Sequence, residues 1–173
     1  MTAHRLRAEP MAKPLHVVLV EPEIPPNTGN IARLCAATQS VLHLVGRLGF
    51  RIDEHAVRRA GLDYWHLVRV EQHVDFDQFL HAFEREGGGR LHLFCAKAGT
   101  SYLEAGFAPG DALVFGKESV GLDAALLERF PDRQRGIPTL GAVRSLNLAN
   151  AASIALYEAL RQLGALDGAH LAP

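Results

Sequence analysis

The sequence predicts an α/β domain in which helices cover both faces of a mostly parallel sheet. Short apolar runs alternate with amphipathic stretches along the whole chain, which is typical of parallel strands joined by crossover helices. With 173 residues, 48% of them hydrophobic and 21% charged, the chain has the size and composition of one globular domain. We expect this domain to span 15–164, with flexible tails at 1–14 and 165–173.

The strands are predicted from apolar runs that end at turn residues. The first run, "LHVVLVEP", is continuously apolar and therefore typical of a strand that is buried on both faces. The later runs are apolar or alternate between apolar and polar residues. The expected strands cover 15–22, 41–46, 65–70, 90–96, 111–116 and 134–138.

The helices are predicted from apolar residues that recur at helical spacing between these strands. Asn27 is expected to cap the first helix, since asparagine is favoured at that position. Phe76, Phe79, Leu80 and Phe83 fall on one face of another helix, which three consecutive glycines end. The expected helices cover 28–38, 53–63, 75–86, 121–130 and 147–164.

Several classes of protein are excluded by motifs that the sequence lacks. No apolar run is long enough to cross a membrane, and the N-terminal stretch has no apolar core of a secretory signal. "NTGNIA" lacks two glycines of a dinucleotide loop, and neither a triphosphate-binding loop nor a serine-hydrolase elbow is present. The nine histidines have no metal-ligand spacing, so we expect no metal site.

Net charge and cysteine content limit the kinds of partner and the cellular compartment that we expect for this protein. The net charge of −1 argues against a protein that coats nucleic acid in general. Four arginines are nevertheless clustered within 47–59, as either a solvated face or a local basic face that could contact nucleic acid. Cys35 and Cys95 both lie in apolar segments, which indicates buried thiols in a cytoplasmic protein.

Polar and glycine-rich residues follow three of the expected strands. They lie at 27–30, 116–121 and 141–150. Because ligands in parallel sheets bind at the carboxyl ends of the strands, these three loops are expected to converge on one site.

The first of these stretches is "EPEIPPNTGNIARL". Asn30 and Arg33 are three residues apart and therefore share a helix face. Arg33 has apolar neighbours, so it is either a surface arginine whose stem covers apolar side chains or a contact to phosphate or ribose.

The other two stretches carry the remaining candidates. Glu118 lies on a turn between two glycines. Its carboxylate either interacts favourably with the dipole of the following helix or belongs to a functional site. Ser145 either caps the final helix or faces the site, although no capping box is present. Asn147 and Asn150 are three residues apart and face one way, as a hydrogen-bonding surface.

Together these motifs give a specific resemblance. "NTGNIARLCAAT", "FGKESVGL" and "IPTLGAVRSLNLANAASIALYEA", in this order, resemble the SPOUT superfamily of knotted RNA methyltransferases. "EPEIPPNTGNIARL" and "RRAGLDYW" are similar to its small single-domain branch, the tRNA ribose 2′-O-methyltransferases that act on a cytidine or modified uridine at wobble position 34. The resemblance covers about 15–163. Lys117 departs from it, because relatives often carry proline there.

The resemblance implies that S-adenosylmethionine is the methyl donor and is bound, bent, in a deep trefoil knot in the C-terminal part of the chain. The knot would form where 136–149 passes through a loop at 116–131. Backbone groups of loops at 94–99, 116–121 and 137–146 would hold the cofactor. The implied cofactor-binding residues are Phe94, Cys95, Gly99, Gly116, Glu118, Gly121, Ile137, Ser145 and Leu146.

The resemblance also implies which residues act on the RNA. The base that takes the proton of the ribose hydroxyl is placed at Arg33 in proposals for the family, but an arginine keeps its proton in proteins. Holding a phosphate and stabilising the developing alkoxide suits Arg33 better, and the proton would leave through Ser145, Glu118 or water. The implied catalytic residues are Arg33, Glu118, Ser145 and Asn147, and the implied substrate-binding residues are Asn27, Asn30, Arg33 and Asn150.

A single small domain of near-neutral charge needs a second source of RNA contacts. The resemblance implies a homodimer in which the last helix of one subunit packs against the first helix of the other, with Arg33 completing the partner's site. Tyr157 is expected at this interface, because the last helix has apolar residues on more than one side and small residues that allow close approach of a partner helix. The apolar residues are Ile154, Leu156, Leu160 and Leu163, and the small ones are Ala149, Ala151, Ala152 and Ser153. Two alternatives stay open: methylation of another tRNA or rRNA position, and a non-catalytic S-adenosylmethionine- or RNA-binding protein.

Overall fold

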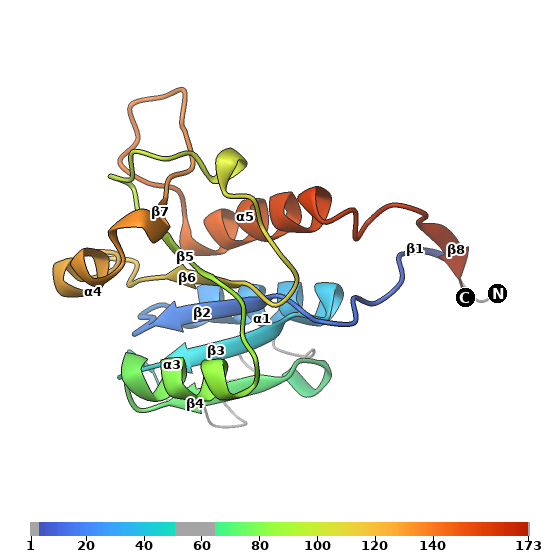
Figure 1. Ribbon diagram of the computed structural model, residues 1–173, viewed down its shortest axis with the longest axis horizontal. Coiled ribbons are helices and arrows are strands. Elements are labelled where there is room, and N and C mark those ends of the chain that lie inside the picture. The colour runs from blue at the N-terminus through green and yellow to red at the C-terminus, as the bar shows by residue number, and fades with distance from the viewer. Residues whose placement is uncertain (1–3, 51–64, 173) are drawn as a thin grey trace.

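The structure, a computed structural model, describes residues 4–50 and 65–172 (Figure 1). A sheet in the order β4-β3-β2-β6-β5-β7 forms its centre, and all neighbouring strands in it are parallel. The predicted α/β class with a mostly parallel sheet is therefore confirmed. The strands are β2 (His16–Val20), β3 (Val41–Val45), β4 (Val70–His73), β5 (Leu91–Phe94), β6 (Ala112–Phe115) and β7 (Gln134–Arg135).

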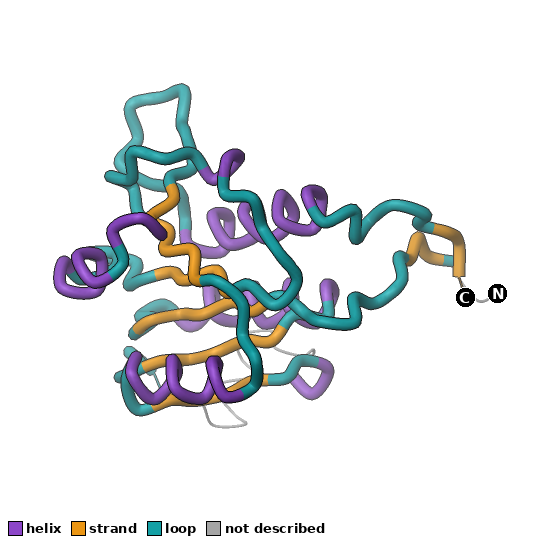
Figure 2. The backbone as a smooth tube through the Cα atoms, in the orientation of Figure 1, coloured by secondary structure: helices purple, strands orange, loops and turns teal. Residues whose placement is uncertain are grey.

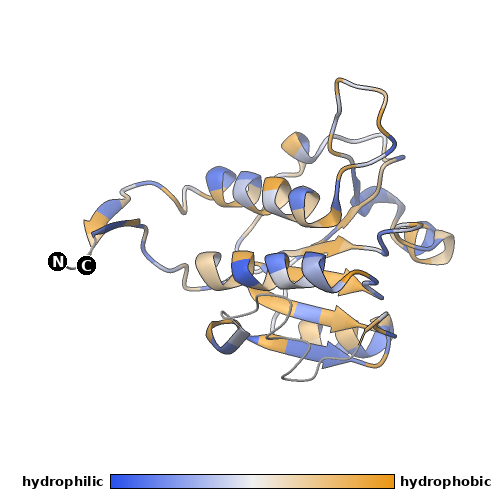
Figure 3. Cartoon of the chain, turned by 180° about the vertical axis from the view of Figure 1, so that it is seen from behind, coloured by the Kyte–Doolittle hydropathy of each residue, from blue (hydrophilic) through white to orange (hydrophobic). Residues whose placement is uncertain are grey.

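Helices cover both faces of this sheet. The first and last helices, α1 and α5, pack together on one face, and α3 and α4 lie on the other (Figures 1 and 3). Within the described ranges, no helix is both long enough and apolar enough to span a bilayer. The helices are α1 (Pro25–Thr38), α3 (Phe76–Arg85), α4 (Ala124–Arg129) and α5 (Leu148–Gln162), with short 3-10 turns at η1 (Trp65–Leu67), η2 (Tyr102–Glu104) and η3 (Pro131–Arg133).

The apolar character of β2 shows how the two layers are held. Val17 and Leu19 point toward α1 and α5, whereas Val18 points toward α3, because side chains alternate along a strand. All three are fully buried. Burying an aliphatic side chain of this size contributes about 1.5–3 kcal/mol, so each face of the strand anchors one helical layer.

The start of α1 differs from the prediction. The helix begins at Pro25 rather than after Asn27, because proline fits the first positions of a helix, where no N–H bond is required. Its N-cap residue is Ile24, which offers no side-chain acceptor. Asn27 is therefore not the cap, and the prediction on this point was wrong. By contrast, α3 begins at the expected place, since Asp75 accepts a hydrogen bond from the Gln78 N–H at 2.8 Å.

Two of the expected strands differ clearly in position or extent. The strand expected at 65–70 is mostly replaced by η1, so that β4 begins only at Val70. The strand expected at 134–138 ends at Arg135, as β7. The helix expected at 53–63 lies outside the described residues, as do three of the four clustered arginines.

The two ends of the chain pair with each other. The strand β1 (Arg5–Arg7) runs antiparallel to β8 (His170–Ala172), and the pair stands away from the main sheet (Figures 1 and 2). Leu6 lies opposite Leu171 in this pair, and both are exposed. Each of the expected tails, 1–14 and 165–173, thus contains a short strand, and their flexibility stays a prediction.

The segment that joins β5 to β6 lies against α5. The amide side chain of Gln162 accepts a hydrogen bond from the Phe107 N–H at 3.2 Å and donates one to the Leu103 carbonyl at 3.1 Å. On another side of the helix, α5 contacts β6. The last helix is thus held between the sheet and the 95–111 segment.

Candidate active site

Two of the expected loops lie side by side at the carboxyl edge of the sheet. The Cys95 N–H, just after β5, donates to the Arg135 carbonyl of β7 at 3.0 Å. Gly136 then donates to the Thr100 carbonyl at 2.9 Å and accepts from the Tyr102 N–H at 3.0 Å. These bonds continue the β5–β7 pairing beyond the strands, so the expected cofactor loops at 94–99 and 137–146 begin next to each other.

The loop after β6 is a tight turn from Lys117 to Gly121. Gly121 donates to the Lys117 carbonyl at 2.8 Å and accepts from the Lys117 N–H at 3.2 Å. A side-chain carbon at Gly116 would collide with the backbone of Gly121, and Gly121 itself has a φ of +76°. Glycine at both positions is therefore required by the turn itself.

Glu118 projects from this turn to the N-terminus of α1. Its carboxylate accepts hydrogen bonds from the Glu23 N–H at 2.8 Å, the Ile24 N–H at 3.2 Å and the Asn27 side-chain N–H at 3.0 Å. Because Ile24 cannot cap the helix with its own side chain, Glu118 supplies acceptors from outside. The negative charge of Glu118 thus interacts favourably with the dipole of α1. It does not serve α4, because Asp123 caps that helix.

Asn27 connects this carboxylate to the last helix. Its side-chain oxygen accepts a hydrogen bond from the Asn147 side-chain N–H at 3.0 Å. The Asn147 oxygen in turn accepts from the Ala149 and Asn150 N–H groups at 2.9 and 3.3 Å and so caps α5. The cap is therefore Asn147, and the alternative that Ser145 caps this helix is excluded. We call the continuous set Glu118, Asn27 and Asn147 the polar bridge.

Sequence reasoning missed two ion and hydrogen-bond partners next to the polar bridge. The Glu23 carboxylate accepts from the Ser119 N–H at 3.0 Å. Hydrogen bonding by the Ser119 side chain, and then by its N–H, lowers the pKa of Glu23. Lys117, where relatives of the resembled family often carry proline, places its amino nitrogen 2.6 Å from the Glu21 carboxylate. The missed signal was the Pro-Pro pair, since a helix that begins at Pro25 has an apolar N-cap and leaves the N–H groups of Glu23 and Ile24 in front of it, where another segment must accept their hydrogen bonds.

Of the predicted cofactor residues, Phe94 is buried, whereas Cys95, expected as a buried thiol, is only partly buried, as are Ile137 and Leu146. The predicted catalytic and RNA-contacting residues outside the polar bridge are exposed. Asn30 and Arg33 share the solvent-facing side of α1, as their spacing predicted, and Ser145 and Asn150 are exposed near the start of α5. Within 4–50 and 65–172, no hydrogen bond joins the side chains of Asn150 and Asn30.

The loops at the carboxyl edge leave room for a ligand that approaches their backbone. Nothing within 4 Å occupies the space that a side chain would take at Gly99, Gly121 or Gly141, one glycine in each loop. Exposed apolar side chains stand beside them at Val120, which is 76% exposed, and Val143, which is 60% exposed. Open glycines next to uncovered apolar side chains fit a ligand with both a polar edge and an apolar ring system, such as a nucleoside.

Comparison with known proteins identifies the family. The sequence model of the SpoU rRNA Methylase family matches residues 14–157, which include all three loops and the polar bridge. The chain belongs to the SpoU rRNA methylase family. This SpoU chain is 46% identical over 155 residues to a tRNA (cytidine(34)-2′-O)-methyltransferase of Burkholderia ambifaria, covering 89% of this chain and 99% of the relative. The enzyme of the same name from Escherichia coli K12 is 46% identical over 151 residues, covering 87% and 94%.

Solved structures of the SpoU family agree in fold. One, described as giving insight into the 2-OH methylation of C/U34 on tRNA, has a TM-score of 0.81 and 48% identity, covering 87% of this chain and 97% of its own. A SpoU methyltransferase from Streptomyces viridochromogenes in complex with AdoMet has a TM-score of 0.74 and 27% identity, covering 89% and 62%.

Proposed function

We propose that this chain is an S-adenosylmethionine-dependent methyltransferase that methylates the ribose 2′-hydroxyl of the wobble nucleotide, position 34, in tRNA. The observation that carries the proposal is its identity of 46% over nearly the whole length of enzymes named for that reaction. This favours position 34 over another tRNA or rRNA position. Asn30, Arg33, Glu118, Ser145 and Asn147 are all present, which argues against a non-catalytic binding protein.

The three loops at the carboxyl edge are the proposed cofactor site. When bound, S-adenosylmethionine supplies a methyl group on an electrophilic sulfonium. The chain's part is to hold that group in line with the ribose oxygen, and positioning of this kind supplies much of the catalysis. Backbone groups of 94–99, 116–121 and 137–146 are suited to this, because Gly99, Gly121 and Gly141 leave their surroundings open.

The polar bridge acts as a positioning element in this proposal. Both carboxylate oxygens of Glu118 already accept hydrogen bonds from α1 and the residues before it, so Glu118 is better suited to fixing the loop than to removing a proton. Asn147 likewise holds the N-terminus of α5, two residues after Ser145.

Because Glu118 and Asn147 are proposed to position the loops, Ser145 and Arg33 are the residues that we propose contact the RNA. Ser145 is exposed, and its hydroxyl makes no hydrogen bond within the part of the chain that the structure describes. We assign it to the ribose hydroxyl, whose proton leaves through Ser145 or water. Arg33 is exposed on α1 and would hold a phosphate and stabilise the developing alkoxide.

We further infer a homodimer formed through the outer faces of α1 and α5. Small residues of α5 that seemed suited to a partner helix, such as Ala149 and Ala152, are instead buried against α1 of the same chain. Ile154 and Tyr157 remain 39% and 47% exposed on α5, and a partner meeting the same patch would cover them. Arg33 on the adjoining helix would then lie close to the partner's site.

We also infer the trefoil knot. The support is that α5 lies between β6 and the 95–111 segment, to which Gln162 is hydrogen-bonded twice. We infer that the chain following β7 passes beneath the 95–111 segment to reach α5, which would make 95–111 part of the threaded loop; the sequence placed this loop at 116–131, and that placement stays a prediction. Closing the ends of an experimentally determined backbone tests this, because a knotted trace does not untie when it is shortened.

A cytoplasmic location follows from the proposed substrate and fits the two free thiols, Cys35 and Cys95. The proposed function itself is tested by incubating the full chain with S-adenosylmethionine and tRNA that lacks wobble methylation. Nucleotide mapping should place one new 2′-O-methyl group at position 34. Methylation confined to another position, or to rRNA, would contradict the proposal.

A further inference from the structure

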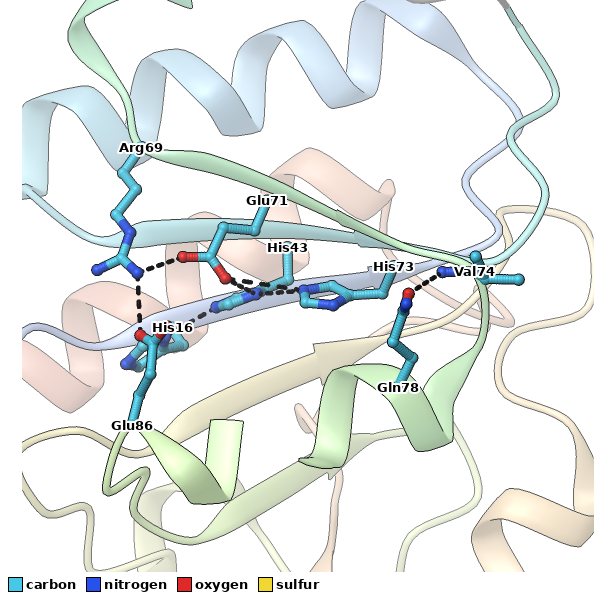
Figure 4. Close-up of polar contacts among 8 residues, drawn as sticks. All are labelled: His16, His43, Arg69, Glu71, His73, Val74, Gln78 and Glu86. Atoms are coloured by element: carbon cyan, nitrogen blue, oxygen red, sulfur yellow. Dashed lines mark hydrogen bonds and ion pairs between the residues drawn. The ribbon is translucent and has the colours of Figure 1, made fainter. Parts of the chain in front are cut away.

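We propose that His43, Glu71 and His73 bind one divalent transition-metal ion of the zinc class, at a site separate from the methyl-transfer loops. The three side chains come from β3 and β4 and converge on the sheet face that carries α3 (Figure 4). Imidazole nitrogens and a carboxylate oxygen are ligands that zinc prefers. The proposed function uses loops after β5, β6 and β7, so this cluster is unused by it.

The spacing of the three donor atoms suits such an ion. His43 Nδ1 lies 3.0 Å from His73 Nε2, and Glu71 Oε2 lies 3.6 Å and 3.9 Å from these two nitrogens. The point equidistant from the three atoms is about 2 Å from each, which is the usual length of a zinc–nitrogen or zinc–oxygen bond. In Figure 4, the Glu71 oxygen faces the gap between the two rings. A fourth position would be taken by water.

The neighbours of the cluster are placed as supporting groups of a metal site usually are. His16 Nδ1 lies 2.8 Å from His43 Nε2, so His43 with Nδ1 on a metal ion would donate its remaining proton to His16. The other oxygen of Glu71 is 2.5 Å from the Arg69 guanidinium, which Glu86 holds at 2.9 Å. His43 and Glu71 are thus each oriented by a further hydrogen-bond or ion-pair partner.

The proton that lies between His43 Nδ1 and His73 Nε2 in their 3.0 Å hydrogen bond would move to another ring nitrogen when a metal ion binds. Burial lowers the pKa of His43 to about 3 and also lowers the pKa of His73, so both rings are neutral at neutral pH and keep a lone pair. Phe79 contacts both rings edge-on and fixes their orientation. The Glu71 side chain is 22% exposed, which leaves an entry path from solvent.

Sequence spacing did not reveal this cluster because its ligands lie on neighbouring strands. Glu71 and His73 are two residues apart and therefore share a face of β4, while His43 comes from β3, 30 positions earlier. Zinc motifs that a sequence reveals, such as H-E-x-x-H, place both histidines on one helix. The expectation of no metal site rested on that spacing alone.

The test uses the full, untagged chain after treatment with a chelator that is then removed. Titration with Zn²⁺ by calorimetry should give one ion per chain, and Co²⁺ should give the visible absorption of a tetrahedral site. Zn²⁺ should also raise the thermal midpoint of unfolding. Glu71→Gln, at a partly exposed position, should weaken binding at least about tenfold and remove the thermal shift. Circular dichroism checks that this variant folds.

Two control variants remove surface groups of the same kind. Glu84→Gln and His81→Gln, both at exposed positions of α3, should bind as the wild type does. Absence of saturable binding to the wild type would overturn the proposal, as would equal affinity in the wild type and Glu71→Gln. In either case His16, His43 and His73 would only form a hydrogen-bonded part of the core.

Discussion

Asn147 donates a side-chain hydrogen bond to Asn27 at 3.0 Å, across 120 positions of the sequence. Asn27 donates in turn to Glu118 at 3.0 Å, so one buried amide connects the N-termini of α1 and α5 to the loop after β6. Two of the three proposed cofactor loops, 116–121 and 137–146, and both proposed RNA-contacting residues, Arg33 and Ser145, belong to these segments or adjoin them. Their relative placement therefore depends on one continuous set of hydrogen bonds, and loss of any member should affect both stability and catalysis.

Asn147→Ala removes the cap of α5 together with the link to Asn27. Loss of a cap and of one part-buried hydrogen bond should lower the free energy of unfolding by about 1–3 kcal/mol. Urea unfolding measures this. Asn150→Ala is the matched control, because Asn150 is exposed and its change should stay within about 0.5 kcal/mol. Equal free energies of unfolding for the two variants would show that the polar bridge does not stabilise the fold.

Glu118→Gln separates a positioning carboxylate from a proton acceptor. Glutamine has one acceptor oxygen where Glu118 uses two, so an amide N–H would face a backbone N–H donor. We expect the free energy of unfolding to fall by about 1–3 kcal/mol, together with methylation. Glu128→Gln, at an exposed position of α4, should change neither. A variant with full stability and no methylation would instead assign Glu118 to proton removal.

Arg33→Ala tests the RNA contact. Because Arg33 is exposed on α1 and lies outside the proposed cofactor loops, methylation should fall by about 100-fold or more while cofactor affinity stays nearly unchanged. Steady-state kinetics and cofactor calorimetry give the two readouts. Arg85→Ala, on α3 at the opposite face, is the control. Loss of cofactor binding in Arg33→Ala would place the side chain in the cofactor site.

Asp111 should contribute stability that depends on pH. This carboxylate is fully buried and accepts hydrogen bonds from the Arg90 N–H, the Ala108 N–H and His92 Nε2 at 2.8, 2.9 and 2.8 Å. Burial alone raises the pKa of Asp111, but these hydrogen bonds outweigh it and lower the pKa. A lowered pKa stabilises the fold above the unfolded value of about 3.9, and this contribution is lost as the pH falls through the folded value.

The measurement is urea unfolding of the wild type and Asp111→Asn from neutral to acidic pH. The wild type should be the more stable at neutral pH, and the difference should shrink once the pH falls below about 4. Asp132→Asn, in the exposed turn η3, should follow the wild type throughout. A difference that stays constant with pH would contradict the assigned hydrogen bonds.

The proposed dimer is tested at Ile154. Ile154→Asp places a charge in the centre of the exposed apolar patch on α5, where burial against a partner would be costly. Sedimentation should give twice the chain mass for the wild type and a monomer for the variant. Val74→Asp, at a 78% exposed position beside α3, should remain dimeric. A monomeric wild type at micromolar concentration would contradict the dimer.

Most secondary structure was predictable because each element carries its own local signal. The apolar run of β2 and the phenylalanine spacing of α3 depend on neighbours within a few residues, and both elements appear where they were expected. The start of α1 was missed because Asn27 was taken as a cap, whereas two prolines open the helix.

The roles of the polar residues were harder to predict from the sequence. Glu118 lies just before α4, and the local pattern connected it with that helix. Its partners are on α1 and the residues before it, with Asn27 91 positions away, so only the fold brings them together. The same holds for His43 and Glu71, whose strands become neighbours only in the sheet. Long-range pairing is not encoded in the spacing of one segment.

The central claim is that the reacting group is the 2′-hydroxyl of nucleotide 34, and a tRNA substrate with a single deoxy substitution tests it most directly. One tRNA lacks only the 2′-hydroxyl of position 34, and a matched tRNA lacks only that of a neighbouring anticodon-loop nucleotide. Methyl transfer from S-adenosylmethionine is then compared on both. The account predicts that the first substrate accepts no methyl group and that the second is methylated as the unmodified tRNA is. Equal methylation of the two would contradict it.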